Sequence, residues 1–565
     1  SAAAAAERRV NTMSKIVLKP VSGLEKCFLD DKFESINEYP RGSMLRGERF
    51  SYQLAFTDLE PGDWKTDVRV RIESPVAELV TLRRVENVPV RMPCNDHCAD
   101  EGFIRTAPGL YPDLLRPFFA EKSRLCITGV TEALWVDVSV PEDSELSGIY
   151  PVTAVFVRED NGQEIVRCNF ELEIIPAKLP LQKTKVTQWF HPDCLAAYYG
   201  VPVFSEEHWS IMARFIRCAV ENGINMILTP IFTPALDTLP GGERPTVQLC
   251  DVYRDGGRWS FGFEKLERWI GMCLELGVEY FEMAHLFTQW GAHHAPKIMA
   301  HVDGEYKQVF GWDTDASADE YRNFLTEFLP QLIDVLKRNG VDDCTVFHIS
   351  DEPGGDHMES YMKAKEVVRE QLTGQTIMDA LSDFEFWKNG VVDCPVVSID
   401  HMDPYLEAGV SGLWTYYCCC QWKGVSNRFV AMPTRRNRVI GQQMYKYDIA
   451  GFLQWGFNFY FAQHSLEVLD PYMCNDGNWW VPAGDAFSVY PAPGGAPYET
   501  IHLLGFTQAM YDMRAFSLAE SLAGRDTVMS IIEERGPVSF KTLPADDDAV
   551  LGVRERINQL IKSRI

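Results

Sequence analysis

The stretch Val346-Phe347-His348-Ile349-Ser350-Asp351-Glu352-Pro353 predicts a buried strand that ends in two adjacent carboxylates. Its apolar residues favour β structure, and the proline stops the strand. A glycine pair then opens a loop, and apolar residues at helical spacing from about 358 to 370 predict a helix. Active sites of barrels and open α/β folds lie at the carboxyl ends of strands, so Asp351 and Glu352 are candidate catalytic residues. A structural role, as helix cap or arginine partner, is the alternative.

The same order of strand, loop and helix repeats along the second half of the chain. About eight such units in roughly 340 residues are typical of a (β/α)8 TIM-like barrel. A doubly wound sheet is the alternative, but strict alternation favours the barrel. The predicted strands are 186–191, 224–229, 278–285, 344–349, 376–379, 396–400, 412–417 and 451–457. The predicted helices are 206–221, 263–276, 318–338, 358–370, 436–450 and 498–522.

The first part of the chain has a different pattern, with short alternating segments and no helical stretch. Strands are predicted at 49–56, 65–72, 134–140, 148–157 and 166–175, separated by turn signals. This pattern indicates a β-sandwich. The chain is therefore expected to be multidomain, β plus α/β, with an N-terminal β-sandwich followed by the barrel. We expect the sandwich over 15–182, a boundary near the linker 176–180, the catalytic barrel over 183–522 and a short helical tail over 523–565.

The charge balance excludes several classes of partner. The 565 residues include 80 acidic and 54 basic side chains, a formal net charge of −26. Such a surface repels nucleic acid and anionic membranes, whereas a neutral substrate suits it. No run of 18 apolar residues occurs, so no membrane insertion is expected. The oligomeric state is not indicated.

The beginning of the chain and its cysteines bear on location. Residues 1–14, with their alanine run, are expected to be a cloning leader or a disordered start, with Met13 as natural start. No basic-then-apolar signal segment follows, so a cytoplasmic location is expected. Fifteen scattered cysteines indicate reduced thiols. Cys418-Cys419-Cys420 is interpreted as small apolar residues at a strand end, because adjacent cysteines cannot all ligate one zinc comfortably.

Nearly every predicted barrel strand ends in a residue suited to a site. A barrel brings these ends to one mouth, although they are dispersed in sequence. Besides the acid pair, the strand ends carry Thr229 and Asp379. The candidate substrate-binding residues are His191, His285, Trp290, Asp400, His401, Trp414, Tyr416, Tyr417, Trp455 and Asn458. Asn458 in particular follows a very apolar strand and needs partners.

The make-up of this set indicates a carbohydrate. Aromatic faces pack against the C–H faces of sugar rings, and carboxylates and amides bond to hydroxyls. No phosphate-binding loop, nucleophile elbow or zinc-protease motif occurs in a supporting context. The loop 287–294 suggests a metal together with His285, but no compact ligand spacing is present, so neither metal nor cofactor is expected. Each aromatic taken alone is more often core.

Glycoside hydrolysis commonly uses two carboxylates, one on each side of the bond. Asp351 and Glu352 are adjacent, which does not rule out an acid and a nucleophile. Their spacing fits better a substrate-assisted site, in which one acid protonates the leaving oxygen. Its neighbour then orients the 2-acetamido group, whose oxygen attacks the anomeric carbon.

The sequence resembles glycoside hydrolase family 123, the β-N-acetylgalactosaminidases. The resemblance covers about 185 to 520, and the family's N-terminal β-sandwich matches the first part. The stretches that carry it are Phe347-His-Ile-Ser-Asp-Glu-Pro353, Gln188-Trp-Phe-His191, His285-Leu-Phe-Thr-Gln-Trp-Gly291, Leu413-Trp-Thr-Tyr-Tyr-Cys-Cys419, Gly451-Phe-Leu-Gln-Trp-Gly-Phe-Asn458 and Gly484-Asp-Ala-Phe-Ser-Val-Tyr-Pro491. One departure is Thr500-Ile501-His502, where the family pattern has an arginine after the isoleucine.

The resemblance implies roles for individual residues. Glu352 would be the general acid/base and Asp351 the acetamido-orienting carboxylate, with retention through an oxazolinium intermediate. Tyr416 or Tyr417 would donate to the acetamido oxygen, and Trp455 would form the floor under the sugar. The implied substrate is an oligosaccharide or glycosphingolipid glycan with a terminal, non-reducing β-linked N-acetylgalactosamine (GalNAc).

Two other functions stay open at this point. One is a glycosidase of different specificity, such as a β-N-acetylglucosaminidase, because the two sugars differ only in the orientation of one hydroxyl. The other is a non-catalytic carbohydrate-binding barrel. Retention of both acids argues against the latter, because binding alone does not require a protonated glutamate.

Overall fold

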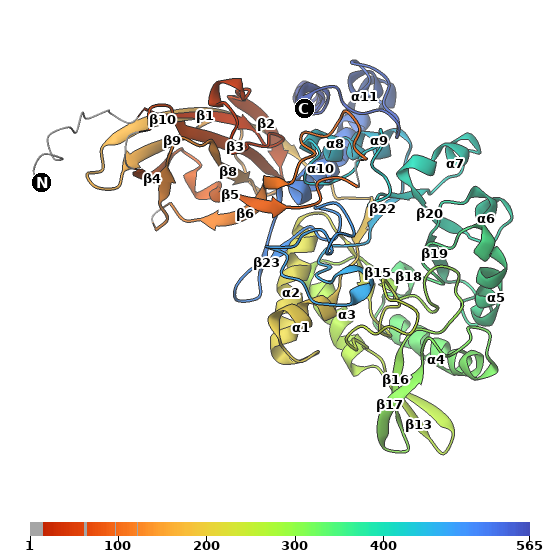
Figure 1. Ribbon diagram of the computed structural model, residues 1–565. Helices are drawn as coiled ribbons and strands as arrows, with labels where there is room; N and C mark the ends of the chain where they lie inside the picture. The colour runs from red at the N-terminus through yellow and green to blue at the C-terminus, as the bar shows by residue number, and fades with distance from the viewer. Residues whose placement is uncertain (1–14, 62–64, 96–97, 121) are drawn as a thin grey trace, which may run out of the picture.

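The computed structural model describes residues 15–61, 65–95, 98–120 and 122–565. Residues 1–14, expected to be a leader or a disordered start, lie outside the described residues. Figure 1 shows the N-terminal strands, in red to orange, beside a larger α/β region in yellow to blue.

The N-terminal region forms two five-stranded sheets. The first has the order β1 (Ile16–Ser22), β3 (Arg49–Asp58), β8 (Glu132–Ser139), β5 (Val80–Val90) and β6 (Gly109–Phe118). The second has the order β2 (Arg41–Arg46), β10 (Glu164–Lys178), β9 (Gly148–Arg158), β4 (Thr66–Glu73) and β7 (Leu125–Ile127). Apolar side chains of both sheets share one hydrophobic cluster. In it, Tyr52 of β3 stacks on Phe170 of β10 with ring centroids 4.0 Å apart.

The strands predicted for this region are all present, but one runs further than expected. Strand β10 continues to Lys178, into the segment predicted as a linker. Its pairing with β2 shifts register between Ile175 and Lys178, so the alternation that marks a strand in sequence is interrupted there.

Eight parallel strands close the barrel, so the predicted eight-stranded barrel is confirmed. In order they are β11 (Lys185–Gln188), β12 (Met226–Thr229), β15 (Tyr280–Met283), β18 (Thr345–Phe347), β19 (Thr376–Ala380), β20 (Cys394–Ser398), β21 (Trp414–Tyr416) and β22 (Gly451–Gln454). The connecting helices are α1 (Pro192–Tyr199), α2 (Glu206–Glu221), α3 (Glu264–Leu276), α4 (Asp319–Arg338), α5 (Met358–Val368), α6 (Phe384–Lys388), α7 (Asp403–Glu407), α8 (Thr434–Arg438) and α9 (Ile440–Lys446). All eight strands were predicted, and the single helix expected over 436–450 is instead divided into α8 and α9.

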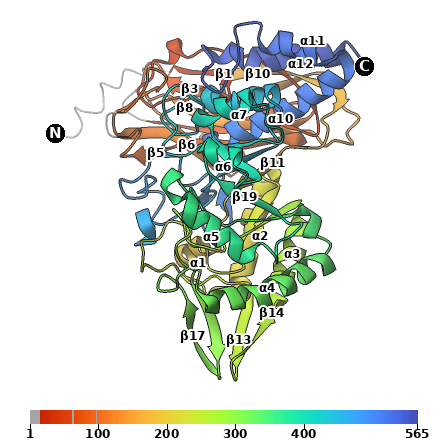
Figure 2. The same cartoon turned by 90° about the vertical axis from the view of Figure 1, so that its right-hand side faces the viewer.

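A small sheet projects from one end of the barrel region and was not predicted. Its order is β14 (Arg258–Gly262), β13 (Asp251–Asp255), β16 (Ile298–Val302) and β17 (Glu305–Phe310). The two hairpins come from the loops after β12 and β15, and Figures 1 and 2 show them pointing away from the N-terminal sheets. These strands are short and mostly solvated, so they leave little hydrophobic pattern.

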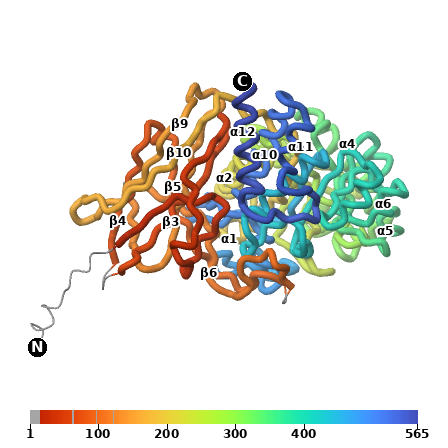
Figure 3. Tube along the Cα trace, turned by 90° about the horizontal axis from the view of Figure 1, so that it is seen from above, coloured from red at the N-terminus to blue at the C-terminus, as the bar shows by residue number. Residues whose placement is uncertain are grey.

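The last helices return to the N-terminal sheets. After β22 the chain forms α10 (Ile501–Ala523), α11 (Arg525–Ile532) and α12 (Leu551–Lys562). Helix α12 contacts α10, β2 and β10, and Figure 3 shows it between the sheets and α10. The buried Arg554 guanidinium bonds both oxygens of Glu48, at 2.7 and 2.8 Å, and Asp512 at 3.1 Å. None of the described helices is long and apolar enough to cross a lipid bilayer.

Helix α10 begins at Thr500-Ile501-His502, the stretch that departs from the sequence pattern of the family. Thr500 caps the helix by accepting a hydrogen bond from Leu503 N at 3.1 Å. The His502 ring contacts both oxygens of Asp113 on β6, at 2.9 and 3.0 Å. The histidine therefore anchors the helix to the first N-terminal sheet.

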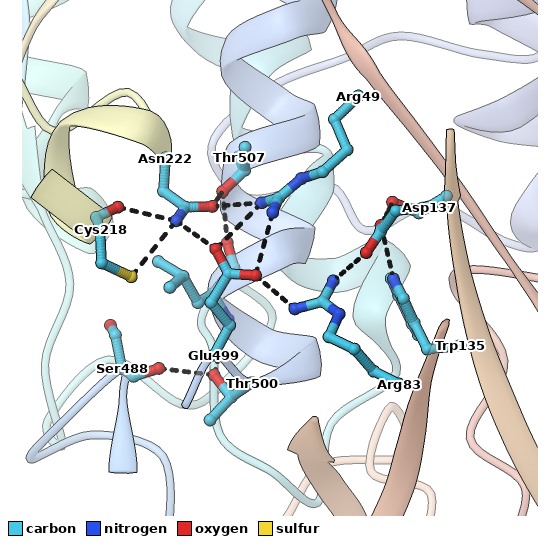
Figure 4. A network of polar contacts seen from close by, with 12 residues as sticks. Arg49, Arg83, Trp135, Asp137, Cys218, Asn222, Ser488, Glu499, Thr500 and Thr507 are labelled. Carbon is cyan, nitrogen blue, oxygen red and sulfur yellow. Dashed lines mark hydrogen bonds and ion pairs between the residues drawn. The ribbon is translucent and has the colours of Figure 1, made fainter. Parts of the chain in front are cut away.

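Glu499 connects the N-terminal sheets to the barrel helices (Figure 4). Arg49 of β3 bonds its two oxygens at 3.0 and 3.1 Å, and Arg83 of β5 bonds it as well. Asn222, at the end of α2, donates to it at 2.6 Å. Burial alone would raise the pKa of Glu499, but the two arginines outweigh burial and lower the pKa to about 2.

Replacement of Glu499 tests this junction. Because its pKa is depressed in the folded state, its contribution to stability is present above the unfolded value of about 4.5 and lost as the pH falls toward 2. We expect Glu499→Gln to lower the free energy of unfolding at pH 7 by about 3 kcal/mol, because it leaves two buried arginines without their carboxylate. Urea unfolding at pH 7 and at pH 3 measures both effects.

The matched control is Glu164→Gln, which removes an exposed carboxylate paired with Arg167. It should change the free energy of unfolding by less than about 1 kcal/mol. Equal effects of the two substitutions would contradict the role of Glu499 at the junction.

Candidate active site

The segment 348–352, which follows β18, is held on both sides by backbone hydrogen bonds at the mouth of the barrel. We use mouth for the carboxyl ends of the eight strands and the loops that follow them. Three carbonyls of this segment accept from the loop after β15, and one of its amides donates to the end of β19. The bonds are Leu286 N to His348 O (3.1 Å), Phe287 N to Ile349 O (3.1 Å), Trp290 N to Asp351 O (2.9 Å) and Glu352 N to Ala380 O (2.9 Å). The positions of Asp351 and Glu352 are thereby fixed by two neighbouring strands.

Glu352 has an unusual backbone conformation. Its φ is +43°, in the left-handed region that non-glycine residues rarely occupy. Such conformations are strained and persist only where surrounding bonds enforce them. Here the amide bond to Ala380 and the bond of the preceding carbonyl to Trp290 enforce the turn.

A buried histidine, three residues before Asp351, lies between two buried carboxylates. His348 Nε2 lies 3.0 Å from Glu282 Oε2, and its Nδ1 lies 3.3 Å from Asp379 Oδ1. Burial alone would lower the pKa of His348, but the carboxylates outweigh burial and raise the pKa to about 9. His348 is therefore an imidazolium at neutral pH. Glu282 also accepts from Trp189 Nε1 at 3.1 Å and from Thr187.

Asp379 connects this cluster to the acid pair. It accepts two hydrogen bonds from Ile349 N, at 2.9 and 3.2 Å, and one from Tyr361 OH at 2.6 Å. Burial raises the pKa of Asp379, while His348 and these donors oppose the rise. The carboxylate therefore holds the backbone two residues before Asp351.

The acid pair has a strongly perturbed electrostatic environment. Asp351 is half-buried, and Glu352 is exposed toward the mouth. Burial and the neighbouring Glu352 raise the pKa of Asp351 well above its usual range, although His348 opposes the rise. Desolvation by the surrounding protein raises the pKa of Glu352, and a hydrogen bond from Tyr416 opposes this rise. The rise is larger for Asp351, which lacks such a donor and has Glu352 beside it.

One oxygen of Asp351 is available to a ligand. Its Oδ1 is buried and has no hydrogen-bond partner among the described residues. A buried carboxylate oxygen normally has a donor, so an unpartnered one next to an acid is a candidate ligand contact.

The structure distinguishes the two predicted tyrosines. Tyr416 OH donates to Glu352 Oε1 at 2.8 Å. Tyr417 OH donates instead to Asn437 Oδ1 of α8 at 2.7 Å, and its ring packs on Phe452, so it points away from the mouth. Trp414 begins β21 and packs on Gly451, at the opposite ends of the strands. Of these three predicted site residues, only Tyr416 reaches the acid pair.

Trp455 belongs to an aromatic cluster at the mouth. Its ring lies 5.1 Å from Phe459 and 5.1 Å from Trp480, between centroids. Its indole N–H donates to Asp485 Oδ2 at 3.0 Å, and the same oxygen accepts from Cys419 N at 3.0 Å. Asp485 is buried, and burial raises its pKa to about 7. Asp485 and Trp480 were not predicted as site residues, because neither ends a barrel strand; the family-like stretch 484–491 was the available signal for Asp485.

Two buried residues at one side of the mouth, His191 and Asn458, are hydrogen-bonded to each other. His191 N donates to Asn458 Oδ1 at 2.9 Å, and Asn458 Nδ2 donates back to His191 O at 3.0 Å. The histidine ring lies 2.9 Å from Trp455 O and 3.1 Å from Arg244, which is paired with Asp193. Burial and Arg244 lower the pKa of His191 to about 4. Both predicted residues are buried and bonded within the protein.

The remaining predicted residues differ in their access to solvent. Trp290 is exposed, and its backbone bonds Asp351. Asp400 and His401 follow β20 and are bonded to each other at 2.9 Å near the surface. His285 is buried, stacks on His348 at 4.5 Å, and both its ring nitrogens are unpartnered among the described residues.

Among the described residues, two groups have ligand atoms close enough to share one metal ion. The first is His285, His348 and Asp379, and the second is Cys418, Cys419 and Cys420; in each, the atoms lie within 4.8 Å of one another. In the first group both His348 nitrogens face carboxylates and carry protons, so no lone pair remains for a metal.

A cleft of about 810 Å³ lies elsewhere, between the N-terminal sheets and the segment before α12. Acidic residues from both parts line it, among them Glu25, Glu38 and Asp546. Its lining contains none of the strand-end residues, so the candidate active site remains the barrel mouth, where the acids with raised pKa values lie.

A barrel that presents two acids at the carboxyl ends of its strands, with aromatic side chains beside them, has the features of a glycoside hydrolase. The model of the catalytic domain of glycoside hydrolase 123 matches residues 189–519. The chain belongs to glycoside hydrolase family 123.

One solved structure shares the fold of the whole chain. One, described in a study of glycolipid glycan hydrolysis as a family 123 glycoside hydrolase from Clostridium perfringens, has a TM-score of 0.71. The match covers 97% of each chain at 14% sequence identity, so it shows a shared fold.

Two β-glucuronidases match far less well. That from Ruminococcus gnavus in complex with D-glucuronic acid has a TM-score of 0.31 at 11% identity, over 81% of this chain and 65% of that one. That from Bacteroides uniformis has a TM-score of 0.30 at 11% identity, over 85% and 49%. Scores this low support no conclusion. A search of curated proteins found no match.

The raised pKa of His348 predicts a loss of stability at alkaline pH. A histidine with a raised pKa contributes stability that is complete below its unfolded value, about 6.5, and is lost as the pH rises through about 9. We expect this contribution to reach about 3 kcal/mol and to be absent in His348→Gln. Urea unfolding at pH 6 and pH 9.5 measures it.

The control is His401→Gln at the exposed strand end, which should keep the wild-type dependence on pH. If His348→Gln kept that dependence as well, the imidazolium assignment would be wrong.

Proposed function

We propose that this enzyme is a retaining β-N-acetylgalactosaminidase that acts by substrate assistance. Its substrates would be oligosaccharides or glycosphingolipid glycans that end in β-linked GalNAc. The observation that carries the proposal is the acid pair: Glu352 is bonded to Tyr416, and Asp351 has a buried, unpartnered oxygen beside it. This oxygen can accept the N–H of an acetamido group.

In this mechanism the two acids share one proton in the free enzyme. Neighbouring carboxylates in a partly buried site cannot both ionise easily, so the pair titrates as a unit. The larger pKa rise of Asp351 supports a mechanism in which Asp351 carries that proton before substrate binds. An acetamido N–H that donates to Asp351 would stabilise its carboxylate and move the proton to Glu352, where the reaction requires it.

The reaction then proceeds in two steps. Glu352 donates its proton to the glycosidic oxygen while the acetamido oxygen attacks the anomeric carbon; the bond to the aglycone breaks and the aglycone leaves as an alcohol. Asp351 stabilises the positive charge on the oxazolinium ring. A water molecule next gives a proton to Glu352 and attacks the anomeric carbon from the aglycone side, which opens the ring and restores the β configuration.

Two observations support the choice of substrate. The aromatic cluster at Trp455 offers a face for a sugar ring, and Asp485 fixes the orientation of that indole. The relative from Clostridium perfringens is described in terms of glycolipid glycan hydrolysis. A β-N-acetylglucosaminidase is the second candidate, since the same acetamido chemistry serves both sugars and the unpartnered nitrogens of His285 could bond a hydroxyl of either.

The location and the domain limits are part of the proposal. We place the enzyme in the cytoplasm, where its odd number of cysteines would stay reduced. Its domains would be 15–182, 183–522 and 523–565. The two N-terminal sheets would form the expected β-sandwich, supported by their shared hydrophobic cluster.

Paired substrates test the mechanism. Wild-type enzyme should cleave 4-nitrophenyl β-GalNAc but not the β-galactoside, because only the first carries the acetamido nucleophile. A GalNAc-derived thiazoline should block cleavage, since it mimics the oxazolinium ring. Equal cleavage of both substrates without a thiazoline effect would assign a carboxylate nucleophile instead, and preferential cleavage of the N-acetylglucosaminide would favour the second candidate.

Substitutions of the two acids should differ in how their effect on kcat depends on the leaving group of the substrate. Asp351→Asn should lower kcat about 100-fold or more on aryl and natural glycosides alike, because it weakens acetamido participation. Glu352→Gln should cost much less on the aryl glycoside, whose leaving group needs little protonation. The same loss for both variants on both substrates would contradict the separate roles.

The tyrosine pair provides a matched test of proton control. Tyr416→Phe removes a hydrogen bond that lowers the pKa of Glu352, so the alkaline limb of the pH–rate profile should move to higher pH. Tyr417→Phe should leave that limb in place, because its hydroxyl bonds Asn437. The comparison is made on kcat/KM between pH 4 and 9, and equal shifts in both variants would exclude the bond to Tyr416 as the cause.

A further inference from the structure

Three consecutive cysteines form a cluster of thiols beside the acid pair. The cluster consists of Cys418, Cys419 and Cys420, which follow β21. It begins two residues after Tyr416, the residue whose hydroxyl bonds Glu352. Their sulfur atoms all lie within 4.8 Å of one another, and the Sγ atoms of Cys419 and Cys420 are 3.8 Å apart. Cys420 is exposed, and the other two are half-buried.

A tight turn explains why the sulfurs converge. Gln421 N donates to Cys418 O at 3.1 Å, and Gln421 Oε1 accepts from Cys418 N at 2.9 Å. In a strand these side chains would alternate between opposite faces, whereas in the turn they come together. Adjacent cysteines were not expected to reach one ion together, but the chain leaves the strand before Cys418 and the three sulfurs converge.

Contacts from distant segments fix the turn. Asn427 donates to Cys418 O at 2.8 Å, and Asn95 donates to Cys419 O at 2.8 Å. Asp485 accepts from Cys419 N at 3.0 Å. The backbone that carries the thiols is thus held in place before any ligand arrives, which lowers the entropic cost of binding.

The sulfur spacing matches the requirements of a thiophilic cation. Zinc–thiolate bonds of about 2.3 Å in a tetrahedral arrangement place two sulfurs about 3.8 Å apart. The separation between Cys419 and Cys420 agrees, and the Cys418 sulfur lies within 4.8 Å of both. Thiolates prefer soft or borderline d10 ions such as Cu(I) and Zn(II) over Mg²⁺ or Ca²⁺. Each thiol loses its proton to solvent on binding, and the exposed Cys420 gives the ion access.

We propose that Cys418, Cys419 and Cys420 form a site for one thiophilic d10 cation, Cu(I) or Zn(II), at the mouth of the barrel. The thiols begin two residues after Tyr416, whose hydroxyl bonds Glu352, so the turn adjoins the acid pair. A bound ion would therefore occupy the space next to the general acid/base and reversibly inhibit hydrolysis. Only this inhibition rests on the proposed function, whereas cation binding does not.

Direct metal binding tests the site without substrate. The reduced, full-length chain is titrated with Co(II) or Cd(II), spectroscopic substitutes for Zn(II), and with Cu(I) in competition with bicinchoninate. We expect a sulfur-to-metal charge-transfer band that saturates at one ion per chain. Tighter retention of Cu(I) or of Zn(II) against a chelator identifies which of the two ions the site prefers.

Serine variants show whether these thiols are the ligands. Cys420→Ser, at an exposed position, should weaken binding about tenfold or more, and the triple serine variant should lose the band. Cys126→Ser, which removes a half-buried thiol on β7, is the matched control and should bind as wild type. Absence of the band in wild type, or its persistence in the triple variant, would overturn the proposal. A Cys419–Cys420 disulfide in the isolated protein, with no metal bound after its reduction, would overturn it as well.

Activity provides the second measurement. One equivalent of the ion should abolish cleavage of the substrate identified above, and a chelator should restore it; the triple serine variant should be insensitive to the ion. Binding with unchanged turnover would overturn the inhibition and leave the ion site standing. If neither the β-N-acetylgalactosaminide nor the β-N-acetylglucosaminide is cleaved, the function proposed for the acid pair fails, while the spectroscopic titration still decides the ion site.

Discussion

The hydrogen bonds of Asp379 hold the backbone that leads to Asp351 and Glu352, the two candidate catalytic carboxyls. Strand β18 pairs with its neighbours over only three residues, and the chain then leaves the barrel. Beyond that point the Ile349 amide has no strand partner, and Asp379 supplies the acceptor from β19. The same carboxylate contacts His348 and holds Tyr361 on α5. One side chain thus couples two strands and a helix, and the acid pair projects from the point where they meet.

The charge of His348 explains how several buried carboxyl groups can lie close together near the mouth of the barrel. Glu282, Asp379 and Asp351 would repel one another in a region with little water. The imidazolium of His348 lies between the first two and also opposes the pKa rise of Asp351. Removing one buried charge leaves the others uncompensated, which is costlier than losing the whole set. The positive charge of the histidine therefore offsets the repulsion among the buried acids, and Asp351 and Glu352 can keep their raised pKa values.

The sequence predicted the barrel well because its signals are local. Each strand is a short apolar run followed by turn residues, and α2 was predicted at both ends, Glu206 and Glu221. The site was harder. Adjacent residues of a strand face opposite sides, and the sequence does not tell which side is inward, so Tyr416 and Tyr417 could not be separated. Asp485 lies in a loop 30 residues beyond Trp455, its partner. The turn at Cys418 depends on Asn95 and Asn427, which no local pattern connects.

The contact of Arg554 with Glu48 has a consequence for biosynthesis. The two residues are 506 positions apart. At ribosomal speeds of about 5–20 residues per second, roughly 25–100 seconds pass between their synthesis. During that time the nascent sheets carry an acid whose final environment is buried, but the arginine that neutralises it there does not yet exist. The surroundings of Glu48 are therefore completed only after α12 has left the exit tunnel, whereas the hydrophobic cluster shared by the two sheets needs no residue of the barrel.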